Sequence, residues 1–140
     1  MKEILKITPE SFAPFGTVLT FGENPPDPRF EIKVTEPAQP WRIAVFCVSI
    51  KAAQRLECHP HSLESFTPLS GTGVLLCASP ETPADVHAFL LDTSVCLGKG
   101  VWHEVITLSE KSFYQITENL EVTSEFYNFT APITIGATEG

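Results

Sequence analysis

Three histidines have a spacing that could place their side chains in one chemical site. His59 and His61 are two residues apart, and His103 follows a glycine-containing turn much later in the chain. Imidazoles that converge from neighbouring strands can hold a divalent metal or exchange protons near neutral pH. We therefore predict a polar site built around His59, His61 and His103, with all three as candidate metal ligands.

The alternation of side chains along a strand predicts which residues accompany the first histidine. Arg55, Glu57 and His59 share one face, and His61 joins them if the strand continues through Pro60. The opposite face is apolar and is expected to pack. For an isolated strand, a polar face that simply meets solvent is the alternative interpretation.

A carboxylate ligand is harder to place. Glu64 lies five residues after His59, so in a regular strand it points away, and Ser65 takes the position in phase. A bulge at Pro60 could restore Glu64, while Glu57 is already in phase. A divalent metal such as Zn, Mn, Ni or Fe is therefore a possible cofactor, and a site without metal remains the alternative.

Short strands at even intervals are expected to position these residues. Turn residues separate the apolar runs, which is typical of an all-β sandwich or barrel. A single helical turn is predicted over residues 8–12, where a capping residue precedes proline. Residues 41–50 are apolar on both alternating faces and predict a central strand covered on both sides, with a hint of a homodimer. The remaining predicted strands are 3–7, 17–21, 55–59, 65–69, 74–78, 87–91, 101–108, 112–117 and 122–129.

Composition limits the class of protein. A chain of 140 residues with 43% hydrophobic content supports one domain, 1–140, with 131–140 expected as a flexible tail. The net charge of -8 disfavours nucleic acid and anionic lipid as partners. The charged start and the lack of a long apolar run predict a cytoplasmic protein without a membrane segment.

Two motifs resemble those of cupins, small β-barrels of the jelly-roll class. The first is His-x-His at residues 59–61, followed by Glu64 and Gly71, and the second is the glycine turn of residues 98–100 that precedes His103. The resemblance implies an all-β, cupin-like (RmlC-like) jelly-roll barrel with one short N-terminal helical turn.

A sharper resemblance extends over most of the chain. Residues 56–69 resemble a signature of the ureidoglycolate lyase family, formerly called ureidoglycolate hydrolases, within the cupin superfamily. Val-Trp-His at residues 101–103 and the opening stretch 7–16 are similar to the same family. The resemblance implies cleavage of ureidoglycolate into glyoxylate and urea during allantoin breakdown.

That chemistry would assign roles to named residues. The resemblance implies His59 and His103 for proton transfer, with Glu57 orienting an imidazole or holding the ureido group. A small-molecule substrate would lie in a pocket walled by aromatic residues. The expected substrate-binding residues are Arg55, His61, Ser65, Phe66, Trp102 and Glu118.

Departures from the family pattern keep other functions open. Cys58 replaces an arginine and Glu118-Asn119 replaces Asp-Arg, so cationic partners for a carboxylate substrate are lost. Arg55 and Lys99 are candidates to supply that charge. A metal-dependent cupin enzyme of another reaction class and a non-catalytic small-molecule-binding module are the alternatives.

Overall fold

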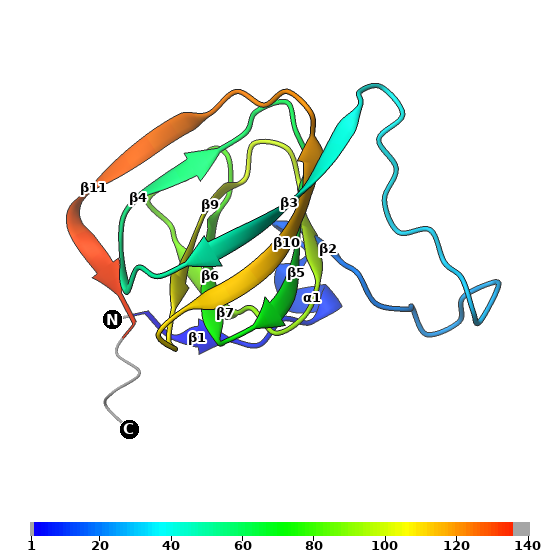
Figure 1. Cartoon of the computed structure of the whole chain (residues 1–140), viewed down its shortest axis with the longest axis horizontal. Helices are drawn as coiled ribbons and strands as arrows, with labels where there is room; N and C mark the ends of the chain where they lie inside the picture. The colour runs from blue at the N-terminus through cyan, green and yellow to red at the C-terminus, as the bar shows by residue number, and fades with distance from the viewer. Residues whose placement is uncertain (1, 136–140) are drawn as a thin grey trace.

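The computed structural model describes residues 2–135 and contains two β-sheets and one short helix (Figure 1). The alternating apolar runs form strands because their side chains can be buried on the sheet faces. The elements are β1 (Ile4–Leu5), α1 (Pro9–Phe12), β2 (Gly16–Val18), β3 (Trp41–Val48), β4 (Ala52–Cys58), β5 (Glu64–Ser70), β6 (Gly73–Ala78), β7 (His87–Leu90), β8 (Val95–Leu97), β9 (Trp102–Thr107), β10 (Ser112–Asn119) and β11 (Glu125–Thr134).

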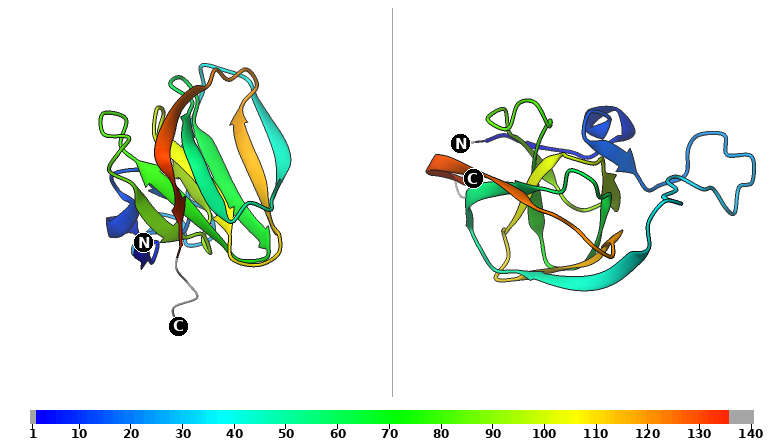
Figure 2. Two further views of the ribbon diagram at one scale, coloured as in Figure 1. Left: turned by 90° about the vertical axis from the view of Figure 1, so that its left-hand side faces the viewer. Right: turned by 90° about the horizontal axis from the view of Figure 1, so that it is seen from above.

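The strand order is that of a jelly roll. One sheet has the order β1-β7-β6-β9-β4-β11, and the other has the order β2-β8-β5-β10-β3. Successive strands from β3 to β11 alternate between the two sheets, except that β6 and β7 pair with each other in the six-stranded sheet. Within the described residues the pairing is antiparallel except between β1 and β7. Figure 2 shows the strands surrounding the barrel interior. The predicted all-β, cupin-like jelly roll is confirmed.

The six-stranded sheet is covered on both faces. Its inner face packs against the five-stranded sheet around Phe66, Leu75, Phe89 and Tyr114. Its outer face forms a second apolar cluster around Leu56, which extends to side chains of β1 and β11. All six residues of β6 are buried, so β6 is the strand covered on both sides.

The prediction of a doubly covered central strand at residues 41–50 is wrong. β3 is an edge strand, and seven of its eight residues are exposed, including Trp41, Ile43 and Val45. An apolar pattern on both faces predicts burial only if other elements cover both faces, and β3 has a paired neighbour on one side alone. Strand β8 has no counterpart among the predicted strands.

The N-terminal prediction is confirmed in detail. Thr8 caps α1, its side chain accepts a hydrogen bond from the Ser11 backbone N–H, and Pro9 occupies the first helical position. At the other end, β11 continues to Thr134, inside the predicted tail 131–140, while residues 136–140 lie outside the described chain. Over residues 2–135, no helix is long and apolar enough to cross a membrane.

Candidate functional site

Two distant segments meet at the end of the barrel. β4 and β9 lie side by side with Glu57 opposite His103. The Gly100 backbone N–H donates to the carbonyl of His59 at 3.0 Å, and this glycine has a positive φ of 80° that a side chain would strain. The glycine turn therefore ties the segment that carries His59 to the segment that carries His103.

A hollow of about 290 Å³ opens at this point between the two sheets, and we call it the histidine hollow. His59 and His103 both line it and are each only 7% exposed. Its aromatic wall includes Phe66, whose ring meets that of His103 edge-on at 6.0 Å. Besides the histidines, the polar residues that line it are Arg42, Glu57, Glu64, Glu104, Glu118 and Ser124.

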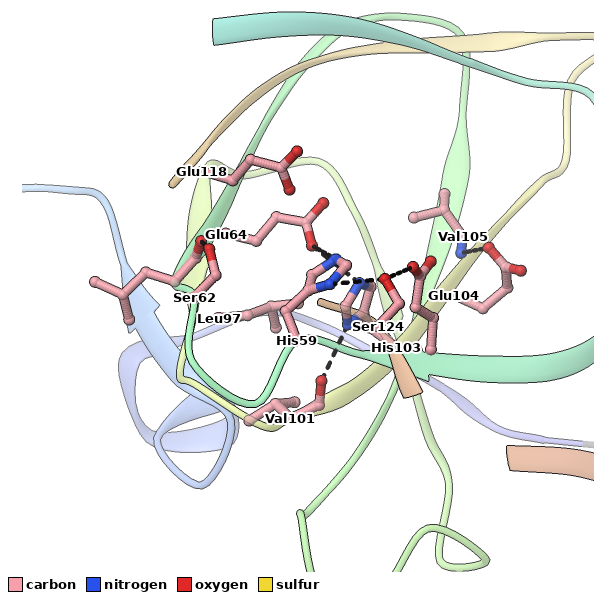
Figure 3. A network of polar contacts seen from close by, with 12 residues as sticks. His59, Ser62, Glu64, Leu97, Val101, His103, Glu104, Val105, Glu118 and Ser124 are labelled. Carbon is pink, nitrogen blue, oxygen red and sulfur yellow. Dashed lines mark hydrogen bonds and ion pairs between the residues drawn. The ribbon is translucent and has the colours of Figure 1, made fainter. Parts of the chain in front are cut away.

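Glu64 directs its carboxylate toward the imidazoles of His59 and His103 (Figure 3). Its Oε1 atom is 3.2 Å from His59 Nε2 and 3.0 Å from His103 Nε2. The expectation that Glu64 points away is wrong, because residues 59–64 do not form one strand. β4 ends at Cys58 and β5 begins at Glu64, and the turn between them resets the alternation.

The opposite side of each imidazole is also held. His59 Nδ1 lies 3.1 Å from the carbonyl of Thr123 and 3.3 Å from Ser124 Oγ, and this hydroxyl donates to Glu57 Oε2 at 2.6 Å. His103 Nδ1 lies 3.0 Å from the carbonyl of Val101. These contacts favour a proton on each Nδ1, which directs both Nε2 atoms toward Glu64.

Burial and neighbouring charges shift the pKa values of the ionisable groups in this cluster in different directions. Burial alone would raise the pKa of Glu64, but the two imidazoles outweigh it and lower the pKa to about 2. The Glu64 carboxylate raises the pKa of His59 to about 9, against the effect of burial. For His103, burial and the charge of His59 oppose the charge of Glu64, and the net direction is upward. Burial raises the pKa of Glu104, which also lines the hollow.

The donor atoms fit a divalent metal. Glu64 Oε1 is buried and receives no well-directed hydrogen bond, although both Nε2 atoms are close. Neighbouring ligands of a first-row metal lie about 3 Å apart, and two imidazoles with a carboxylate are a common ligand set. Two sets of three residues have donor atoms that all lie within 4.8 Å of one another: Glu57 with both histidines, and Glu118 with His59 and Glu64.

The other predicted site residues are divided between the histidine hollow and the rest of the molecule. Phe66 and Glu118 line the hollow. His61 is exposed on the turn after β4, outside the hollow, and Arg55 stacks on the ring of Phe126 at 3.9 Å. Trp102 donates to the carbonyl of Pro80 and belongs to the apolar cluster on the outer face of the sheet.

Ser65 lies in a different hollow from Glu64, its neighbour in the chain. This second hollow, of about 480 Å³, lies between the outer face of the five-stranded sheet and the segment before β3, and we call it the loop hollow. Its lining includes Lys33, Trp41 and Ser65. Among the residues that the structure describes, Glu118 alone lines both hollows.

Sequence reasoning missed Arg42, Glu104 and Ser124. Arg42 was hidden in an apolar run, and Ser124 reaches His59 from 65 residues away along the chain. The position of Glu104 directly after His103 could have marked it as a site residue. Side chains alternate along a regular strand, however, so the sequence places Glu104 on the face opposite His103. Their contribution depends on tertiary contacts that spacing does not encode.

Comparisons with known proteins agree with this architecture. The chain is 33% identical over 132 residues to "Ureidoglycolate lyase" from Pseudomonas aeruginosa PAO1, with 78% of this chain and 77% of the relative covered. The protein of the same name from Pseudomonas paraeruginosa matches to the same extent. Among solved structures, the Staphylococcus aureus capsular polysaccharide assembling protein CapF aligns with a TM-score of 0.55 and 14% identity over 65% of this chain, which spans 27% of that protein.

The family model described as ureidoglycolate lyase matches residues 37–135, which include both histidine segments and β10. The match to CapF concerns the fold alone, because identity is low. The family match and the identity to the Pseudomonas proteins extend over most of the chain, and the chain therefore belongs to the ureidoglycolate lyase family.

Proposed function

We propose that this protein is a carbon–nitrogen lyase that cleaves ureidoglycolate into glyoxylate and urea, or that acts on a closely related small ureido acid. Such a step belongs to allantoin and purine breakdown. The observation that carries the proposal is the buried His59–Glu64–His103 cluster in a member of this family. The histidine hollow, at about 290 Å³, matches a substrate of a few heavy atoms.

The reaction needs one base and one acid. The base takes the proton of the carbinol hydroxyl, the carbon–oxygen double bond forms, the carbon–nitrogen bond breaks, and the acid protonates the departing urea nitrogen. His59 is the acid in this proposal, because its raised pKa of about 9 keeps it protonated at neutral pH. His103 is the base in this proposal, because its Nε2 atom lies in the hollow beside Glu64, and burial together with the positive charge of His59 limits the rise of its pKa that Glu64 causes.

Glu64 and Glu57 act through the imidazoles. Ionised Glu64 faces both Nε2 atoms and can accept or return a proton as the charge of each ring changes. Glu57 holds Ser124, which contacts His59 Nδ1, so the pair fixes the orientation of that ring. This arrangement supports the orienting role that the sequence suggested for Glu57.

We also propose that His59, Glu64 and His103 can hold a divalent metal such as Zn, Mn, Ni or Fe. When bound, the ion would polarise the carbinol oxygen or the substrate carboxylate as a Lewis acid. The imidazoles would then be ligands, and proton transfer would fall to the other carboxylates of the hollow. Metal content of the purified protein, compared with that of a Glu64→Ala variant, distinguishes the two forms of the site.

The test of the activity is urea release from ureidoglycolate by the purified protein. We expect turnover that falls at least about 100-fold in His103→Asn and in His59→Asn, because each removes a proton-transfer group. His87→Asn is the matched control, because His87 lies in β7 and does not line the hollow. Absence of turnover by the wild-type protein, with or without added metal, would contradict the proposal. Substrate-induced thermal stabilisation without turnover would instead indicate a binding module.

We propose a homodimer in the cytoplasm as the working form. The exposed apolar side chains of the edge strand β3, with Val45 at 80% and Trp41 at 61%, support pairing of two copies. The four cysteines within residues 2–135 are free, which suits a reducing compartment. Sedimentation of the wild type and of Val45→Arg tests the dimer, since a charge at this position should produce monomers.

A further inference from the structure

The charge balance of the histidine hollow is unusual for a site that takes an anion. Four carboxylates line it, from Glu57, Glu64, Glu104 and Glu118. Across residues 2–135, Arg42 is the sole Arg or Lys in its lining. A carboxylate substrate therefore meets one permanent positive charge in a strongly acidic surrounding.

Arg55 and Lys99, which the sequence analysis named as candidates to bind a substrate carboxylate, make their contacts outside the histidine hollow. The guanidinium of Arg55 lies over the ring of Phe126 at 3.9 Å. Lys99 Nζ pairs with Glu36 at 2.7 Å, and Glu36 lines the loop hollow. Neither side chain lines the histidine hollow.

Arg42 is placed by the register of β3 on β10. It lies opposite Glu118, and both residues reach the hollow. Arg42 Nε and Nη2 donate to the same oxygen, Glu118 Oε2, at 2.9 and 2.5 Å. A guanidinium has five N–H donors, so this one-oxygen contact leaves donors that can bind a second carboxylate. The Arg42 side chain is 44% exposed, which leaves it accessible to a solute.

We propose that Arg42 binds the carboxylate of the substrate and makes the site selective for ureido acids over uncharged ureides. This inference rests on the proposed function and assigns the anionic part of its substrate. Glu118 is the positioning residue, because its side chain is 10% exposed and fixes the guanidinium at the edge of the hollow. Glu118 also has a carboxylate oxygen within 4.8 Å of donor atoms of His59 and Glu64, so an anion on Arg42 is brought next to the proton-transfer groups.

The first experiment compares KM and kcat of Arg42 variants, because loss of substrate binding raises KM whereas misfolding lowers the amount of active protein. Arg42→Gln removes the charge and Arg42→Lys keeps it without the forked donor geometry. With ureidoglycolate we expect KM to rise about 10- to 100-fold in Arg42→Gln with kcat changed far less, and Arg42→Lys to lie between it and the wild type. Arg29→Gln is the charge-matched control, because Arg29 is 89% exposed and pairs with Asp27 outside the hollow.

The second experiment does not require turnover. Oxalurate carries the ureido group and the carboxylate but has no carbinol to cleave, and oxaluramide is its uncharged amide. Calorimetry should show that the wild type prefers oxalurate and that Arg42→Gln loses most of this preference while binding oxaluramide as the wild type does. If oxalurate binds wild type and Arg42→Gln equally, if both ligands weaken together, or if the wild type binds neither, the assignment is overturned.

The two experiments have distinguishable failures. A wild-type protein that releases no urea but shows an Arg42-dependent preference for oxalurate contradicts the lyase proposal and supports the anion site. A protein that turns over ureidoglycolate with an unchanged KM in Arg42→Gln supports the lyase and overturns the role of Arg42.

Discussion

The two hollows on either side of the end of β10 differ in size and in chemistry. The loop hollow is the larger, about 480 Å³ against 290 Å³, but its walls are mainly apolar and come in part from the long segment before β3 (Figure 1). The histidine hollow gathers two imidazoles, four carboxylates and Arg42 from five strands and the turn after β4. Converging ionisable groups, rather than volume, therefore identify the active-site candidate.

The difference arises from alternation along single strands. In β5, Glu64 lines the histidine hollow and its neighbour Ser65 lines the loop hollow. In β10, Thr117 lines only the loop hollow, while Glu118 reaches both. One strand thus supplies both hollows, and a shift of one residue in register would exchange their linings.

The largest expected effect comes from the neighbouring pair in β5. Glu64→Gln should lower kcat/KM for ureidoglycolate at least about 100-fold, because both imidazoles lose their charged partner. Ser65→Ala should remain within about twofold of the wild type, because its side chain serves the other hollow. Steady-state urea release measures both. Equal losses in the two variants would remove the functional distinction between the hollows.

A smaller effect is expected from the support of His59. Ser124→Ala removes the hydroxyl that joins Glu57 to His59 Nδ1 and should lower kcat about 10-fold, while Ser124→Thr should restore most of it. Ser94→Ala is the control, because its hydroxyl donates to Thr67 away from the histidine hollow. A kcat in Ser124→Ala equal to that of the wild type would show that the ring needs no such support.

The pH dependence of stability should report the same cluster in protein freed of metal by a chelator. The pKa of His59 rises from 6.5 to about 9, so its stabilising contribution is complete below pH 6.5 and is lost as the pH rises through 9. The pKa of Glu64 falls from 4.5 to about 2, so its contribution is complete above pH 4.5 and is lost as the pH falls through 2. Thermal unfolding should therefore show the greatest contribution of the cluster between pH 4.5 and 6.5.

The variant Glu64→Gln provides the control for that measurement. In this variant the contribution of the cluster to thermal stability should no longer change with pH below 4.5 or above 6.5, because neither imidazole then interacts with a charged carboxylate at position 64. A wild-type melting temperature that rises steadily from pH 6.5 to 9 relative to this variant would contradict the assigned charges.

The smallest effect is expected at His61. His61→Asn should leave urea release and metal content at wild-type levels, because His61 is exposed on the turn and does not line the histidine hollow. A fall in metal content matched to that of Glu64→Ala would show instead that the turn rearranges to bring His61 into the site.

Most strands could be predicted from periodicity, because a buried face leaves a period of two in the sequence. The helical turn at Pro9–Phe12 was predictable from its cap and proline. The prediction failed where burial depends on what else is nearby. β3 has the apolar pattern of a covered strand yet lies at an edge, and the short β8 left no pattern long enough to detect.

For the site, the sequence by itself determined the jelly-roll class, the family resemblance and the pairing of His59 with His103, since these follow from local patterns and motif order. Only the tertiary structure decided the partners of those rings. Glu64 comes into place because a turn interrupts the strand, Arg42 because β3 pairs in register with β10, and Ser124 because the loop before β11 lies against His59. A site assembled across strands depends on register and turns, which residue spacing along one strand does not specify.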